Sequence, residues 1–403
     1  MAKKLTHQTN QGERPLNSSP GPDPVKILHV LGRMAAGGVE TWLLQVLRRV
    51  DRSRFQIDLL VRREGPYDGE AWNLGAKVLY CPYPAAPWAV AANFHHLLRE
   101  HGPYQIIHNH LPLGDFLLLL AHRRGVPCLI HHCHSDEERM LTSAGPLRRF
   151  LLTFSKALTR RYATLGLAVS NRAARWRFGS RWQADSRVRL FPSAIDLEAF
   201  QAPMNPAAVR RELGIPENAF IIGHVGRFFE VKNHAFLVEI FAEVSRREPR
   251  AVLLLVGDGP LRPAIEQRVA ALGLEPRVYF SGVRADVPRL MLGAMDLFLF
   301  PSRFEGLAMA VIEAQTAGCP CLLADTISAE ADIIPPLVRR LPLSHSASAW
   351  ADAALAIKGS PASVTREEAL ARIEHSFFDI RTSVSNLEAL YGGLVRGGGG
   401  LTG

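Results

Sequence analysis

The sequence predicts an α/β protein made of two parallel-sheet halves that face each other across a cleft. Its 403 residues exceed what one typical core accommodates, so two domains are expected. Short apolar runs alternate with helical patterns along the chain, which is typical of parallel sheets with helices between the strands. A loop-rich stretch over 191–206 separates a first alternating series from a second. Ligands bind at the carboxyl ends of such strands, so we expect the chemistry in the cleft.

The first half is expected to span 25–195, after a tail over 1–24. That tail has Gln, Asn, Ser, Gly and Pro where an ordered segment would need apolar residues, so it is predicted to be disordered. The expected strands of this half are Val25–Leu31, Phe55–Val61, Lys77–Tyr80, Gln105–Asn109, Val126–His131, Leu165–Ser170 and Arg187–Phe191.

The second half is expected to span 196–375. Its expected strands are Phe220–Val225, Ala251–Val256, Arg277–Phe280, Leu297–Phe300 and Pro320–Leu323. A last helix, around Phe377–Leu390 and within 376–392, is predicted to return toward the first half. The glycine-rich residues 393–403 are predicted to form a flexible tail.

Composition indicates a soluble protein of the cytosol. Apolar residues make up 47% of the chain and charged residues 21%, which is ordinary for a globular protein. The five cysteines are odd in number and lack the spacing of zinc or redox motifs, so reduced thiols are expected. No apolar core of a secretory signal follows Lys3 and Lys4, and no apolar run approaches the roughly 20 residues of a spanning helix.

Positive charge is concentrated in the first half of the chain. Residues 1–200 hold 27 Lys and Arg against 16 Asp and Glu, and 139–189 hold twelve against one. Within this region, 146–162 mixes clustered Arg and Lys with Phe and Leu, as a basic amphipathic helix on an anionic membrane does. The alternative is a helix whose apolar stripe packs into the core. No nucleic-acid motif accompanies the charge, so nucleic acid is not an expected partner.

Two carboxylates are spaced to hold a long anionic ligand in the segment from Pro301 to Gly318. A strand is expected to end at Phe300, and Glu305 then lies next to a glycine at the mouth of a predicted helix. Glu313 is expected about two turns into that helix, roughly 12 Å further along its axis. One acid could hold sugar hydroxyls and the other ribose hydroxyls, with phosphates facing the helix N-terminus. The alternative is a pair of solvated surface charges, which the apolar neighbours of Glu313 disfavour.

Glycines and cations follow other predicted strands. Gly37 and Gly38 open a helix where backbone N–H groups could approach an anion, although the pattern is not a dinucleotide fingerprint. Gly226 precedes Arg227 and Lys232, whose guanidinium and ammonium together could neutralise a diphosphate. The alternative for this pair is two exposed surface cations. The turn Val256–Pro260 is interpreted as mainly structural.

Histidines end two neighbouring predicted strands. They occur at His108 and His110, and again at His131, His132 and His134. The His-x-His spacing is one that zinc uses, but no carboxylate or thiolate set completes a site persuasively. Neutral histidines that bind sugar hydroxyls, or satisfied interior histidines, are the favoured interpretations.

These residues, in this order, resemble the retaining glycosyltransferases of the family-4 type, also called the glycosyltransferase group 1 family. The resemblance covers about 25–392, and its histidine stretches and the run from Glu313 to Pro320 are similar to the branch that serves capsular and exopolysaccharide assembly. It implies the GT-B fold, in which two Rossmann-like domains face each other across a cleft. It also implies a basic N-terminal domain for the acceptor and a C-terminal domain for the nucleotide sugar.

The resemblance implies a role for each matching residue. Arg227 and Lys232, with Gly226, would hold the donor diphosphate and stabilise the departing charge. Glu313 would bind ribose hydroxyls, and Gly37 and Gly38 would approach the phosphates from the other domain. The donor sugar would be bound by Glu305, by the backbone amides of Gly306, Leu307, Ala308 and Met309, and by His134, with His132 as the alternate. The reaction would retain configuration without an obligatory metal or a dedicated protein base, and hinge closure would assemble the site.

The sequence departs from the family pattern at Ser193 and Ala194, where many relatives carry Asn-Gly, and at Ala308 in the sugar loop. The expected activity is hexosyl transfer from a nucleotide sugar, most of all a UDP-sugar, to a lipid-linked or oligosaccharide acceptor. A peripheral position on the inner face of the cell membrane is expected. Two rivals are a nucleotide-sugar epimerase of the same fold and a non-catalytic homologue in a polysaccharide-assembly complex.

Overall fold

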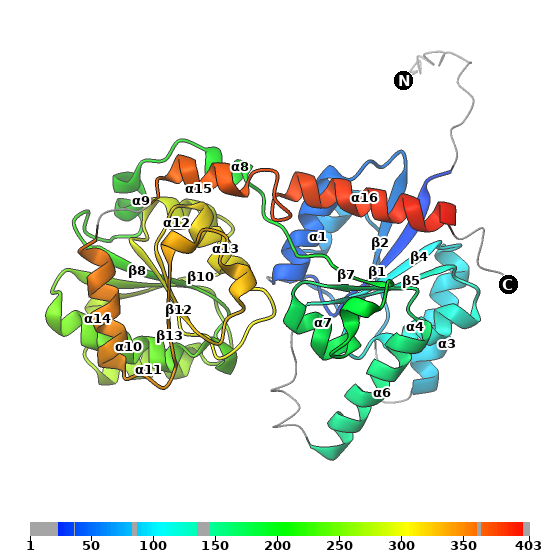
Figure 1. Ribbon diagram of the computed structural model, residues 1–403, viewed down its shortest axis with the longest axis horizontal. Helices are drawn as coiled ribbons and strands as arrows, with labels where there is room; N and C mark the ends of the chain where they lie inside the picture. The colour runs from blue at the N-terminus through cyan, green and yellow to red at the C-terminus, as the bar shows by residue number, and fades with distance from the viewer. Residues whose placement is uncertain (1–22, 36, 83–86, 135–144, 361–363, 398–403) are drawn as a thin grey trace, which may run out of the picture.

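The computed structural model describes residues 23–35, 37–82, 87–134, 145–360 and 364–397. Within them the chain forms two parallel sheets, each flanked by helices, and the two halves lie side by side along the long axis (Figure 1). The predicted α/β class with two parallel-sheet halves is confirmed. Except for Asp23 and Pro24, the tail predicted over 1–24 lies outside the described residues.

The first half contains a seven-stranded parallel sheet in the order β3-β2-β1-β4-β5-β6-β7. The strands are β1 (Val25–Val30), β2 (Phe55–Val61), β3 (Val78–Tyr80), β4 (Ile106–Asn109), β5 (Cys128–Cys133), β6 (Leu165–Ala168) and β7 (Val188–Leu190). The helices are α1 (Gly38–Arg49), α2 (Asp68–Asn73), α3 (Pro87–His101), α4 (Asp115–Arg123), α6 (Pro146–Tyr162), α7 (Asn171–Phe178) and the 3₁₀ turn η1 (Trp182–Ala184).

The second half contains a six-stranded parallel sheet in the order β10-β9-β8-β11-β12-β13. The strands are β8 (Phe220–Val225), β9 (Ala251–Val256), β10 (Val278–Gly282), β11 (Leu297–Phe300), β12 (Cys321–Ala324) and β13 (Val338–Leu341). The α-helices are α8 (Glu198–Gln201), α9 (Pro206–Glu212), α10 (His234–Arg247), α11 (Arg262–Ala271), α12 (Val287–Gly293), α13 (Met309–Thr316), α14 (Ala347–Lys358) and α15 (Arg366–Ile373). The 3₁₀ turns are η2 (Glu230–Lys232), η3 (Glu275–Arg277), η4 (Ala329–Ala331) and η5 (Pro335–Leu337).

The central strands are almost wholly apolar because helices cover both of their faces. Every residue of β9 and of β11 is buried, and Phe298 and Phe300 are among the largest fully buried side chains. Such runs give no polar alternation, which is the expected pattern for parallel strands between two helical layers. The carboxyl ends of both sheets are therefore held rigidly, and the loops that follow them can present side chains at fixed positions.

The chain crosses between the halves twice, and the two crossings pair with each other. Ile195 N donates to Phe378 O at 2.9 Å and Ile380 N donates to Ile195 O at 3.0 Å, forming an isolated parallel bridge between Ile195 and Asp379. After the second crossing, helix α16 (Ile380–Gly397) packs beside α1 on the first half (Figure 1). The last helix returns to the first half as expected from the sequence, and these backbone bonds join the two crossings to each other.

Three sequence expectations for these elements were wrong in detail. Helix α16 continues to Gly397 because Tyr391 and Leu394 pack into the first core, so residues 393–397 are helical rather than a flexible tail, and 398–403 lie outside the described residues. Strand β5 begins at Cys128, two residues later than expected, because Pro127 has no N–H for the ladder. Strand β13 was not predicted, since its half-exposed Val-Arg-Arg-Leu carries a weak apolar signal.

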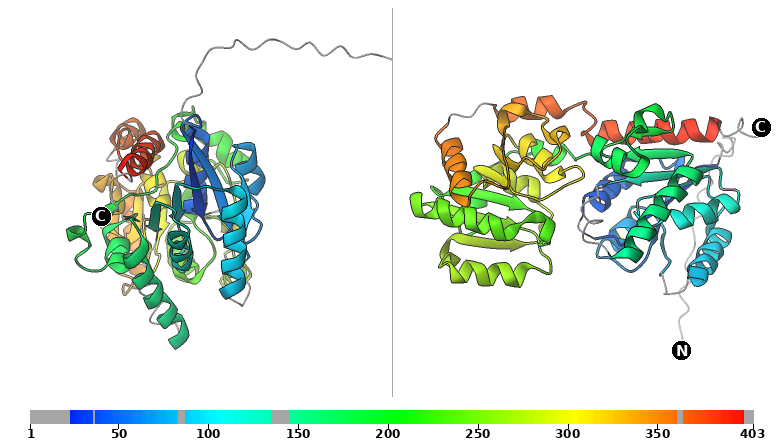
Figure 2. Two further views of the ribbon diagram at one scale, coloured as in Figure 1. Left: turned by 90° about the vertical axis from the view of Figure 1, so that its right-hand side faces the viewer. Right: turned by 60° about the horizontal axis from the view of Figure 1, so that its bottom comes forward.

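Helix α6 projects away from the first sheet, as the front view and the side view both show (Figures 1 and 2). Its buried residues are confined to Leu152, Ser155, Leu158 and Thr159. Among the described helices, none has the length and apolar content needed to cross a bilayer.

Candidate functional site

The loop after β8 carries Gly226 and Arg227, and a glycine turn fixes its path. A Cβ on Gly257 would lie 2.2 Å from Gly226 O, and one on Gly259 would lie 2.8 Å from Phe228 backbone atoms. Both glycines also have positive φ, at 133° and 158°, so only glycine fits this close approach. Phe228 N donates to Asp258 O at 3.0 Å. The turn predicted to be structural therefore holds the backbone beside the exposed Arg227 side chain.

Lys232 and Glu305 form an ion pair at the carboxyl ends of β8 and β11 in the second half. Lys232 Nζ lies 2.6 Å from Glu305 Oε1, with 18% and 15% of the two side chains exposed. The ammonium also lies 4.8 Å from the centre of the Phe300 ring. Lys232 ends η2, and Glu305 lies in the loop after β11, so the pair joins two loops that follow neighbouring strands.

Two backbone contacts hold those loops together. Asn233 adopts a left-handed conformation at φ 57° and donates from Nδ2 to Pro301 O at 3.1 Å. Arg303 N donates to Val231 O at 2.8 Å. Because both bonds are made by the main chain or to it, the separation of Lys232 from Glu305 is fixed by the fold rather than by the ion pair alone.

Glu313 lies on α13, close behind the loop that carries Glu305. The helix begins at Met309, so Glu305 lies four residues before it and Glu313 little more than one turn inside; the expected two turns were wrong. Burial raises the pKa of Glu313 to about 7. Among the described residues, its carboxylate forms no hydrogen bond or ion pair, which leaves both oxygens available to hydroxyl donors.

The N-terminus of α1, in the first half, lies against the N-terminus of α13. A Cβ on Gly38 would lie 3.8 Å from Met309 Cγ, so the first residue of α1 contacts the first residue of α13 across the cleft. The Glu40 carboxylate folds back over the start of α1, where a Cβ on Gly37 would lie 2.4 Å from Glu40 Oε2. Burial raises the pKa of Glu40, opposed by a bond from its own backbone N–H and by the charge of Arg227.

Glu40 is thus a cleft residue to which the sequence interpretation gave no role. A helix N-terminus attracts anions, and here an acid of the helix's own first turn lies over it. The signal was present, because an acidic residue two positions after Gly38 can reach back to the first turn. It was missed because a first-turn acid is also an ordinary helix-stabilising feature.

The sugar loop reaches the histidines of the first half through Leu307. This side chain packs against the cluster of buried residues that includes Cys133 and Trp176. His134 follows Cys133 directly and is half-buried, whereas His132 is fully buried inside β5. The structure therefore brings the sugar loop next to the end of β5, where His134 is partly exposed and its alternate His132 is fully buried.

Five histidines and Tyr391 form one continuous hydrogen-bonded chain below His134. The contacts are His134 Nε2 to His110 Nδ1 at 2.8 Å, His110 Nε2 to His29 Nδ1 at 2.9 Å, His29 Nε2 to Tyr391 Oη at 3.0 Å, Tyr391 Oη to His108 Nδ1 at 2.8 Å, His108 Nε2 to His132 Nδ1 at 3.3 Å, and His132 Nε2 to Phe191 O at 2.8 Å. Burial, together with neighbouring histidines, lowers the pKa of His29 and His132 to about 3, and places the pKa of His108, His110 and His134 well below the usual value.

The hydrogen bonds of this histidine chain can be donated in only one direction. The Phe191 carbonyl can only accept, so His132 must donate from Nε2 and accept at Nδ1. Each neutral histidine has one donor and one acceptor nitrogen, so the role of each following group is fixed in turn. The order is His108, Tyr391, His29, His110 and then His134. His134 therefore donates from Nε2 to His110, and its Nδ1 is an acceptor.

The same cluster contains the residues that could hold a metal ion. The groups His29, His108 and His110, and His110, His132 and His134, each have ring nitrogens within 4.8 Å of one another. Metal ligation at His110 Nδ1 and His134 Nε2 would require both nitrogens to be unprotonated, whereas the hydrogen bond between them needs one proton. The two states are exclusive, and the hydrogen-bonded one satisfies the buried nitrogens of the chain without an ion.

Comparisons with known proteins match both halves of the chain. Residues 207–363 match the family described as Glycosyl transferases group 1, and 36–199 match Glycosyltransferase Family 4. The chain is 36% identical over 375 residues to the putative glycosyltransferase EpsF of Bacillus subtilis, covering 91% of this chain and 96% of EpsF. It is 26% identical over 313 residues to an Escherichia coli UDP-Gal:alpha-D-GlcNAc-diphosphoundecaprenol alpha-1,3-galactosyltransferase, covering 75% and 79%.

Solved structures share the fold. Anabaena HepE, in a complex with UDP and glucose, superposes with a TM-score of 0.77 at 20% identity, covering 91% of this chain and 99% of HepE. The lipopolysaccharide-biosynthesis glycosyltransferase WaaG superposes with a TM-score of 0.72 at 19% identity, covering 91% and 100%. The GT-B arrangement of two Rossmann-like domains is thereby confirmed.

Proposed function

The chain belongs to the group 1, family-4 glycosyltransferases, and from this premise we propose that it transfers a hexosyl unit from a UDP-sugar to a lipid-linked acceptor with retention of configuration. The observation that carries the proposal is the ion pair of Lys232 with Glu305, set beside Arg227, Glu313 and the N-terminus of α1. Cations for a diphosphate and carboxylates for hydroxyls thus lie together at the carboxyl ends of two facing sheets.

The donor is proposed to lie along the second half. Arg227 and Lys232 bind the diphosphate, with Gly226 in the same loop, and Gly37 and Gly38 face the phosphates from the first half. The Glu40 carboxylate lies over that N-terminus, so donor binding requires that it moves away or is protonated. Glu313 accepts hydrogen bonds from the ribose diol.

The sugar is proposed to lie between the two halves. Glu305 and the amides of 306–309 bind its hydroxyls from one side. From the other side, His134 Nδ1 accepts a hydrogen bond from a sugar hydroxyl. Glu305 also holds the Lys232 ammonium in place, so one carboxylate positions both the sugar and the cation beside its leaving group.

In the proposed reaction, the bond from the anomeric carbon to the diphosphate oxygen breaks and a bond to the acceptor oxygen forms on the same face. The acceptor hydroxyl proton passes to the departing diphosphate oxygen, so no protein base is required and UDP leaves with that proton. Arg227 and Lys232 stabilise the charge that develops on the diphosphate, which is commonly the largest electrostatic contribution to such a step. No metal is required in this scheme.

A lipid-linked acceptor in exopolysaccharide or capsule assembly fits the relatives and one surface of the protein. The Escherichia coli relative acts on a diphosphoundecaprenol-linked sugar. Helix α6 exposes Leu147, Phe150, Leu151 and Phe154, with 71%, 64%, 42% and 49% of each residue accessible. These positions repeat at i, i+3, i+4 and i+7, so they form one apolar stripe, which suits a peripheral position on the cytoplasmic face of a membrane.

Substitution of Lys232 tests the donor site. We predict that Lys232→Ala lowers kcat by about 10²–10³ while the protein stays folded, as for removal of one charge-stabilising donor. Lys358→Ala is the matched control. Lys358 is the last residue of α14 and forms an ion pair with Glu248, outside the proposed donor site. Full activity in Lys232→Ala would refute the site assignment.

The donor itself can be identified by thermal shift with a panel of nucleotide sugars, since a ligand that binds the native state raises the apparent stability. UDP-sugars are expected to raise the Tm of the wild type and to do so much less in Glu313→Ala. A panel in which only another nucleotide stabilises the protein would reject the UDP assignment.

A further inference from the structure

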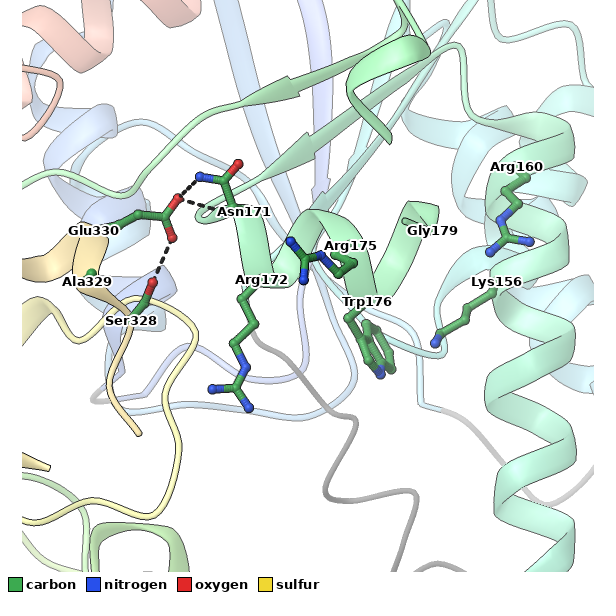
Figure 3. Close-up of a pocket in the computed structure, with 10 residues that line it drawn as sticks. All are labelled: Lys156, Arg160, Asn171, Arg172, Arg175, Trp176, Gly179, Ser328, Ala329 and Glu330. Atoms are coloured by element: carbon green, nitrogen blue, oxygen red, sulfur yellow. Dashed lines mark hydrogen bonds between the residues drawn. The ribbon is translucent and has the colours of Figure 1, made fainter. Parts of the chain in front are cut away.

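The start of helix α7 in the first half meets the turn η4 of the second half, beside a pocket lined by α6, α7 and η4 (Figure 3). Asn171 is the first residue of α7, and Glu330 is the middle residue of η4. Glu330 Oε1 accepts from Asn171 N at 2.8 Å and also from the Asn171 side-chain amide, as the dashed lines in Figure 3 show. One carboxylate of the second half is therefore bound twice by the first half.

The Glu330 carboxylate forms part of the N-terminal cap of α7. The first N–H groups of a helix have no partner inside the helix itself. Here Ser170 Oγ accepts from Ala173 N at 3.2 Å, and Glu330 accepts from Asn171 N. The helix dipole also favours a negative charge at this end. The second half thus supplies one of the groups that cap a helix of the first half.

Glu330 is itself fixed within the second half, and a neighbouring bond reinforces its contact. Glu330 Oε2 accepts from Ser328 Oγ at 2.8 Å, so both carboxylate oxygens are engaged. Beside it, Arg172 Nη1 donates to Thr326 O at 3.2 Å. Both acceptors lie in the loop that follows β12, so consecutive residues of α7 bind one loop of the second half. We call the bonds from Asn171 to Glu330 and from Arg172 to Thr326 the α7 contact.

The loop after β12 also holds the loop that carries Glu305. Thr326 Oγ1 donates to Ser302 O at 2.8 Å, and Ser302 is a fully buried residue three positions before Glu305. The neighbouring carbonyl, Pro301 O, is held by Asn233. Thr326 therefore bonds to the first half through its carbonyl and to the Glu305 loop through its hydroxyl.

Helix α7 in turn supports the sugar loop from the first half. Its residues Ala173, Ala174 and Trp176 belong to the buried cluster that includes Cys133, and Leu307 packs against this cluster. Separation of α7 from η4 would therefore also draw Leu307 away from the end of β5. Contacts between domains are commonly polar and limited in area, so a few directional bonds can decide how often two domains are closed.

We propose that Glu330 is a positioning residue for transfer, which keeps the two halves closed around the donor by bonding to the start of α7. This assignment rests on the proposed function, because it assumes that transfer needs groups from both halves. Glu330 does not touch a substrate in this scheme. It acts through the α7 contact, which fixes the Glu305 loop relative to the first half.

Two substitutions remove the α7 contact from opposite sides. Glu330→Ala removes the carboxylate. Asn171→Pro removes the backbone N–H and the side-chain amide together, and proline is favoured at the first position of a helix. Ser170 is already extended, at φ −154° and ψ 161°, as the residue before a proline requires, so α7 should keep its fold. Glu330→Gln keeps one oxygen that can accept from Asn171 N and tests rescue by a conservative variant.

The control is Glu266→Ala. This variant also removes a carboxylate that accepts a hydrogen bond, from Arg262 Nε at 2.7 Å, but both residues belong to α11 in the second half. The radius of gyration is measured for each protein by small-angle X-ray scattering without ligand. The Kd of UDP is measured by calorimetry, and kcat is measured with a UDP-sugar and an acceptor.

The expected result is a loss of kcat without a matching loss of UDP binding. Glu330→Ala and Asn171→Pro should lower kcat by about tenfold or more, because only the closed fraction of molecules is competent for transfer. The Kd of UDP should change by no more than about threefold, since its proposed cations and ribose ligand all lie in the second half. Both variants should have a larger radius of gyration. Glu330→Gln should fall between Glu330→Ala and the wild type, and Glu266→Ala should match the wild type.

Three results would overturn the assignment. They are an unchanged kcat in both contact variants, an unchanged radius of gyration in both, and an equal loss of kcat in the Glu266 control. A wild type that neither binds UDP nor transfers a sugar would refute the proposed function instead. The scattering comparison would still test closure in that case, because it needs no substrate.

Discussion

At the scale of single residues, the cleft holds its charges in opposed pairs before any ligand binds. Lys232 lies 2.6 Å from Glu305, and Arg227 is close enough to Glu40 to oppose the rise in its pKa. Cations that are already oriented need little rearrangement when a diphosphate arrives. Glu313 differs, because its charge is half-buried without a compensating cation among the described residues.

The pKa of Glu313 gives a prediction for stability against pH. It is raised from 4.5 to about 7 by burial, so between these values the unfolded chain releases a proton that the folded chain keeps. The free energy of unfolding therefore falls as the pH rises through this window. Glu313→Gln cannot ionise and should be more stable than the wild type at pH 8, by up to about 3 kcal/mol, yet nearly equal at pH 5.

Thermal unfolding at the two pH values checks this, with Glu275→Gln as a control that makes the same charge change at an exposed position. The glutamine variant should also lose most of the stabilisation by UDP, because an amide offers fewer acceptors to the ribose diol. The same Tm difference at pH 5 and pH 8 would contradict the burial of this charge.

The sequence alone marked Arg227, Lys232, Glu305 and Glu313 as candidate site residues, because each follows a predicted strand that is an apolar run. It could not show which groups meet. The pairing of Lys232 with Glu305 depends on β8 lying beside β11, which is a tertiary property. The bond of Asn171 with Glu330 is similar, since the two residues lie far apart in the chain and meet only in the folded protein.

At the scale of elements, the return of α16 matters because it completes the histidine chain. Tyr391 comes from that helix, whereas His29 and His108 come from β1 and β4, adjacent strands of the first sheet. The sequence predicted a returning helix and two histidine groups, but nothing in the spacing linked residue 391 to them. The helix therefore contributes a hydroxyl that sets the direction of donation up to His134.

We predict that Tyr391→Phe removes the fixed order of donors and acceptors along the histidine chain. Without the hydroxyl, His29 loses its acceptor, and His29 and His110 can reverse their tautomers so that His134 Nδ1 carries the proton. Two buried groups lose a partner, which should cost about 1–3 kcal/mol each. Imidazole nitrogen NMR on histidine-labelled protein should show an unprotonated His134 Nδ1 in the wild type and a mixture in the variant.

Tyr279→Phe is the control for this experiment, because its hydroxyl donates to Gly214 O away from the chain. A wild-type His134 that is protonated at Nδ1 would contradict the single direction. So would a Tyr391→Phe spectrum that is identical to the wild-type one.

The hydrogen-bonded histidine chain also predicts whether transfer depends on a metal ion. Dialysis against EDTA should leave transfer unchanged, because the hydrogen-bonded state of His110 and His134 excludes ligation of an ion between them. Activity and metal content are measured before and after dialysis. Loss of activity that zinc restores would instead assign His110, His132 and His134 as ligands.

At the scale of the whole molecule, the two halves meet through few described contacts around a cleft. The paired crossings at Ile195 and Asp379 form one contact, and the bonds from Asn171 to Glu330 and from Arg172 Nη1 to Thr326 O at 3.2 Å form another, beside the pocket lined by α6, α7 and η4. The two-sheet arrangement was predictable, because each strand carries its own apolar signal. The distance between the halves could not be predicted from the sequence, because it depends on side chains that meet only after both halves have folded.

The most direct test of the donor and acceptor assignments is transfer itself. UDP-hexoses are incubated with diphosphate-lipid-linked sugars, UDP release is followed, and the anomeric configuration of the product is read by proton NMR. The expected result is acceptor-dependent UDP release that forms a product with the donor's configuration, and a rate lowered by about 10²–10³ in Lys232→Ala. An inverted product would contradict the proposed function, as would conversion of a UDP-sugar to its epimer without acceptor.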